Sequence, residues 1–197
     1  MRKLTIDDIA DARAYERERA ELRRHIIELK RVRRVALGPL ATIVFENTET
    51  MRWQVQEMAR VERMLRDEQI QHEVDTYNEL IPGEHQLSGT LMLELTSDAE
   101  LREWLPRLVG IEHQVAFTFP DGSSARGKPS DEDESRLTRA DTTAAVHFLK
   151  FELTPGQVGA FAEGPVTLAS EHPAYRHEVV LGDATRASLA ADLADRS

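Results

Sequence analysis

Apolar positions in the first third of the chain recur every three or four residues, which is the spacing of an α-helix. This pattern predicts one long helix over residues 11–33, with acidic side chains early and basic ones late, as the helix dipole favours. The first half of this helix is charged nearly all round, so it is expected to project or to meet a partner. A second long helix is predicted over residues 49–68, where Met51, Val55 and Met58 begin an apolar stripe.

The remainder of the chain alternates apolar and polar residues with a period of two, which is typical of β-strands. The clearest strand is predicted at residues 87–95, and an Asp121-Gly122 turn predicts a hairpin. Residues 126–141 include an acidic run without periodicity and are expected to form a mobile loop. Further strands are predicted at 35–37, 40–46, 144–153, 166–169 and 175–181, so that 85–181 is sheet-rich, and a small-residue helix follows at 183–193.

These elements favour a single α+β domain over residues 1–197 with a mostly antiparallel sheet. The strands are joined partly by hairpins, which connect antiparallel neighbours. The two long N-terminal helices and several shorter helices are expected to pack on one face of that sheet. With 197 residues and a hydrophobic content of 41%, the chain is long and apolar enough to bury a core.

The chain contains no cysteine. Disulfides, thiol catalysis, thiolate zinc sites and iron–sulfur clusters ligated by cysteine are therefore excluded. No apolar run approaches the roughly 20 residues of a membrane span, and the first residues lack the apolar core of a signal peptide. A cytoplasmic location without membrane contact is the expectation that follows.

Charge is spread unevenly along the chain. The net charge is −10, yet residues 1–34 contain eleven Lys and Arg against seven Asp and Glu. The basic run at residues 30–34 could contact nucleic acid or another anionic partner, or it could complement the C-terminus of the first helix. The second interpretation is favoured, because the acidic remainder of the chain repels a phosphate backbone, so nucleic acid is not the expected partner.

Histidine is the next residue type that could carry chemistry, since Gly-rich phosphate loops, His-Glu-x-x-His and Gly-x-Ser-x-Gly motifs are absent. His113, His147 and His177 each alternate with apolar residues in a predicted strand. If these strands are neighbours, the imidazoles could converge with a carboxylate and bind a divalent metal. The alternative is an isolated hydrogen-bonded histidine near each strand end. The carboxylates considered are Glu152, Glu94 and Glu46.

A polar cluster on the second helix is the other candidate. Gln56, Glu57 and Arg60 are spaced so that they share one side of the helix. They could form a pocket wall with an acid and an anion clamp, or an ordinary solvated face with weak ion pairs. The remaining binding candidates lie at predicted turns, where a structural role is the favoured interpretation: Tyr77, Asn78 and His172.

Several of these segments, in their order along the chain, resemble an uncharacterised bacterial domain-of-unknown-function family, number 3501 in its catalogue. The resemblance rests on Lys3-Leu4-Thr5, Arg33-Arg34-Val35-Ala36-Leu37-Gly38-Pro39, Val55-Gln56-Glu57-Met58, Tyr77-Asn78, Leu108-Val109-Gly110-Ile111-Glu112, Ala145-Val146-His147-Phe148-Leu149 and His172-Pro173-Ala174-Tyr175.

The resemblance implies a redox or oxidative-stress setting, since genes of this family often lie beside rubrerythrin-like and iron–sulfur oxidoreductase proteins. A chain without cysteine fits an accessory protein better than an electron carrier. The leading hypothesis is therefore a non-catalytic accessory protein that binds a redox partner through its charged first helix and the polar side of its second helix. A metal-binding protein or enzyme with a histidine–carboxylate site is the alternative, and a homodimer is a further expectation.

Overall fold

The computed structural model describes residues 1–129 and 141–194, and within them eight strands form one antiparallel sheet with the order β1-β2-β3-β6-β5-β4-β7-β8. Consecutive strands are often neighbours because tight turns join them. The strands are β1 (Arg34–Leu37), β2 (Ala41–Glu46), β3 (Gln86–Leu93), β4 (Val115–Thr118), β5 (Ser124–Pro129), β6 (Val146–Glu152), β7 (Thr167–His172) and β8 (Tyr175–Val180).

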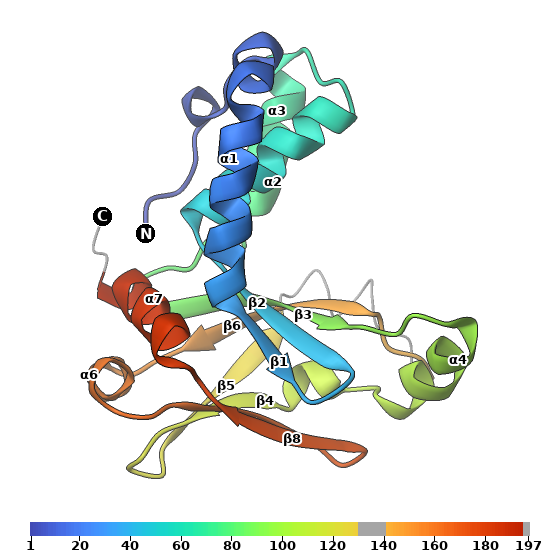
Figure 1. Ribbon diagram of the computed structural model, residues 1–197, viewed down its shortest axis with the longest axis vertical. Coiled ribbons are helices and arrows are strands. Elements are labelled where there is room, and N and C mark those ends of the chain that lie inside the picture. Colours follow the sequence, from blue (N-terminus) through green and yellow to red (C-terminus); the bar gives the residue numbers. More distant parts are fainter. Residues whose placement is uncertain (130–140, 195–197) are drawn as a thin grey trace.

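The sheet curls until its two edge strands, β1 and β8, approach each other, so that it forms a nearly closed barrel (Figure 1). The seam is bridged by Tyr175 of β8. Its hydroxyl donates to the carbonyl oxygen of Leu37 at 2.7 Å and accepts from the amides of Leu40 at 2.8 Å and Ala41 at 3.1 Å. Gly38 turns at this place with φ of 75°, and a Cβ there would lie 2.5 Å from the ring of His177. The close contact across the seam therefore requires glycine at position 38.

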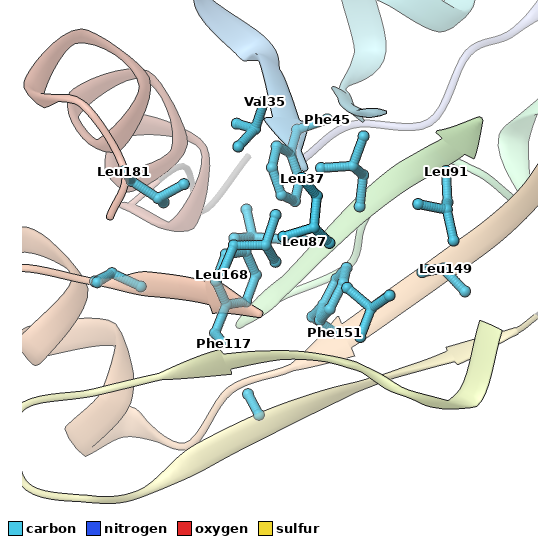
Figure 2. Packing of buried hydrophobic residues seen from close by; sticks show 14 of the residues in the cluster. Val35, Leu37, Phe45, Leu87, Leu91, Phe117, Leu149, Phe151, Leu168 and Leu181 are labelled. Atoms are coloured by element: carbon cyan, nitrogen blue, oxygen red, sulfur yellow. The ribbon is translucent and has the colours of Figure 1, made fainter. Parts of the chain in front are cut away.

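The interior of the barrel is a packed apolar core rather than a channel (Figure 2). Its centre is an aromatic group in which the rings of Phe117 and Phe151 lie 4.8 Å apart and those of Phe45 and Phe117 lie 5.6 Å apart. Gly89 leaves room for Ile43, because a Cβ at position 89 would lie 2.8 Å from the Ile43 side chain. The alternation predicted for the strands is thus confirmed by which side chains point inward.

Three helices stand on the outside of this barrel as an arm (Figure 1). They are α1 (Ala12–Arg33), α2 (Thr48–Val61) and α3 (Asp67–Asn78). A second apolar cluster joins α2 and α3 to the N-terminal segment and the outer face of the sheet; its buried members are Leu4, Met51, Val55, Val74, Leu80 and Ile81. Every residue of β2 is buried, because its inner face lines the barrel and its outer face lies under the arm.

The prediction of one helix over residues 49–68 is wrong at its end. Helix α2 ends at Val61, and Arg63 adopts φ of 52°. The amide of Met64 then bonds the carbonyl of Ala59 at 2.9 Å, while that of Arg63 bonds the carbonyl of Arg60 at 3.3 Å. This is a Schellman motif in which Arg63 takes the left-handed position that glycine usually occupies. The sequence therefore has no glycine that would predict the end of the helix.

The shorter helices do not share one face of the sheet, which corrects the predicted arrangement. Helix α4 (Asp98–Arg107) lies on one side of the barrel, whereas α6 (Pro155–Glu163) and α7 (Asp183–Ala194) lie on the other (Figure 1). Helices α6 and α7 send Phe161, Leu189 and Leu193 into the interior core. Two 3-10 helices complete the described elements: η1 (Ile6–Asp8) and η2 (Ile111–His113).

The expected loop over residues 126–141 begins too early, because β5 continues to Pro129 and pairs with β6. The rest of that segment, residues 130–140, lies outside the described residues. Among the described helices, none has the length and apolar character that a membrane span needs.

Candidate functional site

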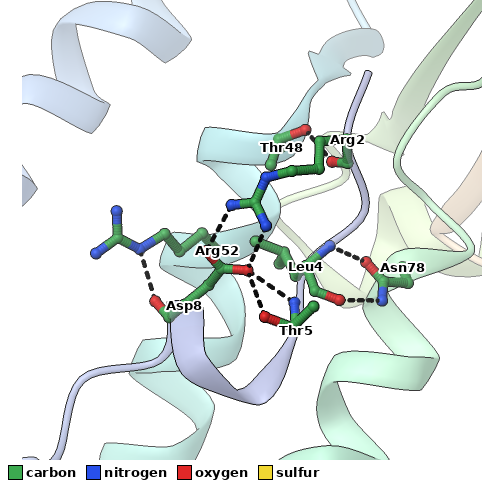
Figure 3. A network of polar contacts seen from close by, with 7 residues as sticks. All are labelled: Arg2, Leu4, Thr5, Asp8, Thr48, Arg52 and Asn78. Carbon is green, nitrogen blue, oxygen red and sulfur yellow. Dashed lines mark hydrogen bonds and ion pairs between the residues drawn. The ribbon is translucent and has the colours of Figure 1, made fainter. Parts of the chain in front are cut away.

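Two side-chain amides of the arm bind the backbone of the N-terminal segment. Gln56 accepts from the amide of Ala10 at 3.0 Å and donates to its carbonyl at 2.9 Å. Asn78 does the same with Leu4, at 2.8 and 2.9 Å (Figure 3). Lys3 adds an ammonium that donates to the carbonyls of Asn78 and Ile81 at 2.6 Å each, at the C-terminal end of α3. These contacts hold residues 3–10 along α2 and α3.

Glu57 is the centre of an ion pair between α1 and α2. Arg19 binds both of its carboxylate oxygens, at 2.7 and 2.8 Å, and the hydroxyl of Tyr15 donates to one of them at 2.6 Å. The two hydrogen bonds from Arg19 are the main cause that lowers the pKa of Glu57 to about 2. Burial, followed by the hydrogen bond to Glu57, raises the pKa of Tyr15 above its ordinary value. Glu57 is therefore a permanent anion that is already neutralised within the chain.

Arg60 lies one turn further along α2 and pairs with Glu16 of α1 at 3.0 Å. The structure thus brings Gln56, Glu57 and Arg60 together on one side of α2, as their spacing predicts. All three contact the first helix or the segment before it. The polar side of the second helix, proposed above as a partner surface, is consequently occupied by the chain itself.

The basic run at residues 30–34 also has partners within the chain. Arg33 is almost fully buried and binds the carbonyls of Phe45 and Glu46, at 2.8 and 3.1 Å, together with the carboxylate of Asp192 on α7. Arg34 pairs with Glu94, and Arg31 pairs with Glu28 at 2.9 Å. The contacts of Arg33 join α1, β2 and α7, whereas the Arg31–Glu28 pair is exposed and lies within α1.

The histidines named as metal candidates are not brought together. His147 is buried inside the barrel, as its alternation predicts, with Nε2 3.0 Å from both Thr143 Oγ1 and the carbonyl of Ala144. His177 lies at the β1–β8 seam, its ring 4.4 Å from that of Tyr175. The prediction for His113 is wrong: it lies in η2 with a half-exposed side chain, because the strand begins only at Val115.

Glu152, the favoured carboxylate, is exposed on β6 and pairs with Lys128 at 2.9 Å. Within residues 1–129 and 141–194, no three His, Asp or Glu side chains are close enough to hold a metal ion. His172 is buried and has contacts at both ring nitrogens: Nδ1 accepts from the amide of Ala174 at 3.2 Å, and Nε2 lies 3.1 Å from the carbonyl of Val109. These two contacts tether the β7–β8 turn to the segment around Val109.

A pocket between the arm and the outer face of the sheet is the strongest candidate site. Its volume is about 320 Å³, at the low end of the roughly 300–1,000 Å³ of small-molecule sites. Both apolar and polar side chains line it. The lining residues come from α1, β1, β2, α2, β3, β6 and the end of α3: Lys30, Arg34, Val44, Glu46, Met51, Gln54, Tyr77, Leu80, Thr90, Met92 and Phe148.

The carboxylate of Glu46 is the unusual group of this pocket. Its side chain is 5% exposed. One oxygen, Oε1, accepts from the hydroxyl of Thr90 at 2.9 Å. The other, Oε2, is buried without a hydrogen bond in the structure and has the ammonium of Lys30 at 4.0 Å. A buried carboxylate oxygen without a donor is costly, and in natural proteins such a group calls for an explanation.

Of the residues considered as candidate sites in the sequence, Tyr77, Glu46 and two members of the basic run, Lys30 and Arg34, line this pocket. Glu46 was considered as a metal ligand at a sheet edge, but it lies on the outer face of β2 with Thr42 and Val44. A signal was available, because Glu46 is the one charged residue in an otherwise uninterrupted strand, and a strand with two buried faces would bury it as well. The sequence singled out Lys30 only as part of the basic run at residues 30–34, and nothing in the sequence placed Lys30 or Gln54 beside Glu46.

Comparison with known proteins places the chain among proteins without an assigned role. The family model that is described as "Protein of unknown function (DUF3501)" matches residues 3–193. A crystal structure described as a novel protein of unknown function from Burkholderia pseudomallei K96243 is similar over 98% of this chain and 100% of that chain, at 32% identity and a TM-score of 0.89. No curated protein matches the chain.

Proposed function

The chain belongs to the DUF3501 family, and from that premise we propose that it is an accessory protein that binds a small organic molecule between its helical arm and its barrel. The observation that carries this proposal is the Glu46 carboxylate in the pocket lining, whose buried Oε2 has no hydrogen-bond donor and only the ammonium of Lys30 at 4.0 Å. A ligand donor would satisfy that oxygen and remove the energetic cost of burying it alone.

The composition of the pocket wall supports the same proposal. Val44, Met51 and Phe148 supply apolar surface, while Gln54 and Tyr77 present polar groups that make no side-chain hydrogen bond to other described residues. Binding sites for small molecules typically combine a mostly apolar lining with a few polar groups that orient the ligand. The barrel interior lacks this character in the described residues, because aromatic and aliphatic side chains fill it.

A ligand-observed NMR screen of a fragment library containing cationic, neutral, anionic and zwitterionic compounds tests this function. The wild-type protein is compared with Gln54→Phe, which fills the pocket, and with Gln54→Ala, which enlarges it while also removing the amide. Hits are expected for the wild type and Gln54→Ala and are expected to disappear in Gln54→Phe. A screen with no hits, or with hits that Gln54→Phe leaves unchanged, would contradict the proposal.

A second candidate function, the docking of a protein partner, is favoured by a different observation. At the far end of the arm Val61 and Leu65 are 62% and 82% exposed, beside a hollow of about 440 Å³ that Met64 and Ile70 help to line. Exposed apolar side chains that lie together often mark an interaction site. That the partner is a redox protein rests on the family resemblance alone.

Pull-down from native cells followed by identification of the retained proteins tests this second candidate. A redox protein is expected with the wild type and not with the double variant Val61→Ser, Leu65→Ser. Equal recovery with both proteins would refute docking at the tip of the arm. Sedimentation of the purified protein checks the homodimer, which would occupy the same tip and would also be lost in the double variant.

A further inference from the structure

Two opposite charges face the arm–barrel pocket without a hydrogen bond between them. The ammonium of Lys30 lies 4.0 Å from Oε2 of Glu46, which is beyond hydrogen-bond distance. Glu46 is deep in the pocket at 5% exposure, whereas Lys30 is nearer the solvent at 32%. The third charged residue of the lining, Arg34, is already paired with Glu94.

A zwitterion carries one ammonium and one carboxylate. The first could donate to Glu46, and the second could accept from Lys30. Glu46 Oε2 is an acceptor in need of a donor, and an ammonium group offers three. Among the described residues, the ammonium of Lys30 has Glu46 as its ion-pair partner at 4.0 Å and makes no hydrogen bond, and a carboxylate offers oxygens that accept charge-assisted bonds. A ligand that carries only a cation would meet the ammonium of Lys30, and one that carries only an anion would meet the carboxylate of Glu46, so each would face a like charge.

Resting on the proposed function, we infer that the pocket takes a zwitterionic ligand of the amino-acid type with an apolar side chain. Its ammonium would donate to Glu46 Oε2, and its carboxylate would accept from Lys30. The apolar side chain would lie against Met51, Met92 and Phe148. The amide of Gln54 and the hydroxyl of Tyr77 stand at the wall as further polar contacts.

The size and fastening of the pocket fit a ligand of this class. A volume of about 320 Å³ suits a molecule of amino-acid size. Glu46 is held in place from one side, since Thr90 occupies its other oxygen at 2.9 Å. The carboxylate is thereby oriented before binding, which lowers the entropic cost of ligand recognition.

The test is a calorimetric cycle of ligands against variants. The ligands are L-leucine, L-methionine and L-phenylalanine, each with its amine analogue that lacks the carboxylate and its acid analogue that lacks the ammonium. With the wild-type protein, at least one amino acid is expected to bind ten times more tightly, or better, than both of its analogues. The difference arises because each analogue leaves one charge of the pocket unpaired.

Two variants locate the charges. Glu46→Gln is expected to abolish the preference for the amino acid over its acid analogue, and Lys30→Met to abolish the preference over its amine analogue. Lys30 is partly exposed near the end of α1, so Lys30→Met is expected to fold. If Glu46→Gln fails to fold, Lys30→Met alone still tests the inference. Arg31→Met, on the same helix but outside the pocket lining, is the matched control and is expected to preserve the wild-type preferences.

The outcomes separate this inference from the function on which it rests. If no amino acid is preferred over its analogues, while the fragment screen gives hits that Gln54→Phe removes, the pocket binds another class and the zwitterion inference is wrong. If preferences exist but neither Lys30→Met nor Glu46→Gln changes them, the charges have been assigned wrongly. If neither the panel nor the screen gives a ligand, the proposed function itself fails.

Discussion

The hydroxyl of Tyr175 is predicted to be the main fastening of the barrel seam. Tyr175→Phe removes one oxygen and keeps the ring. The carbonyl of Leu37 and the amide of Ala41, both buried, then lose a partner, whereas the amide of Leu40 is partly exposed and can bond water. A buried polar group that loses its partner costs about 1–3 kcal/mol. With two such groups and some relaxation of the turn, we expect a loss of about 2–4 kcal/mol in the free energy of unfolding.

Equilibrium unfolding in urea measures this loss. The midpoint of the transition is expected to fall in Tyr175→Phe while the slope stays the same, because the surface exposed on unfolding does not change. Hydrogen exchange adds a local readout, since the amide of Ala41 should exchange faster than in the wild type.

Tyr77→Phe is the matched control for this substitution. It removes the same atom from a partly exposed tyrosine whose hydroxyl makes no hydrogen bond within residues 1–129 and 141–194. A change within about 0.5 kcal/mol is expected there. If Tyr175→Phe is no more destabilising than Tyr77→Phe, the seam is held by side-chain packing and the reasoning from hydrogen bonds is refuted.

Three further predictions concern the arm. The pKa of Glu57 is lowered to about 2 from 4.5, so its contribution to stability is present above about pH 4.5 and is lost as the pH falls towards 2; the stability difference between wild type and Glu57→Gln should therefore shrink over that window, and a difference independent of pH would contradict it. Asn78→Leu should speed exchange of the Leu4 amide roughly tenfold, which NMR exchange rates measure, and unchanged protection would show that the side-chain amide is dispensable. Arg33→Met should destabilise the protein by about 3 kcal/mol in urea unfolding because it leaves a buried partner unpaired, whereas Arg31→Met on the exposed side should stay within about 0.5 kcal/mol; equal effects would refute the fastening role.

Local signals in the sequence were sufficient for most of the elements. The predicted bounds of helix α1 are correct to within one residue. The Asp11 carboxylate caps its start by accepting from two backbone amides, and basic residues gather in its last turn. The strands were found because alternation separates core from solvent on each of them. Long-range contacts had no such signal. Closure of the barrel depends on a hydroxyl of β8 that meets the turn after β1, more than 130 positions earlier in the chain.

The candidate site was less predictable than the fold, for related reasons. The polar cluster of α2 was identified correctly as a cluster, but spacing on one helix says nothing about which segment covers it. The parity of a strand residue was informative for His147 and misleading for His113, which lies just before its strand begins. The Lys30–Glu46 pair brings a helix end beside a strand, and only the assembled fold shows that a pocket lies between them.

The paired hydrogen bonds of Gln56 and Asn78 have a consequence for how the chain tolerates change. A carboxamide presents one donor and one acceptor, as a peptide group does, so each of these side chains reads main-chain atoms and ignores the side chain of the residue it holds. Position 10, where alanine is only partly buried, can therefore vary widely without loss of its anchor. Replacement of Gln56 or Asn78, in contrast, removes these hydrogen bonds whichever residue stands at position 10 or 4. For these four main-chain hydrogen bonds the N-terminal segment depends on Gln56 and Asn78, whereas Lys3 and the buried side chain of Leu4 hold it through side chains of its own.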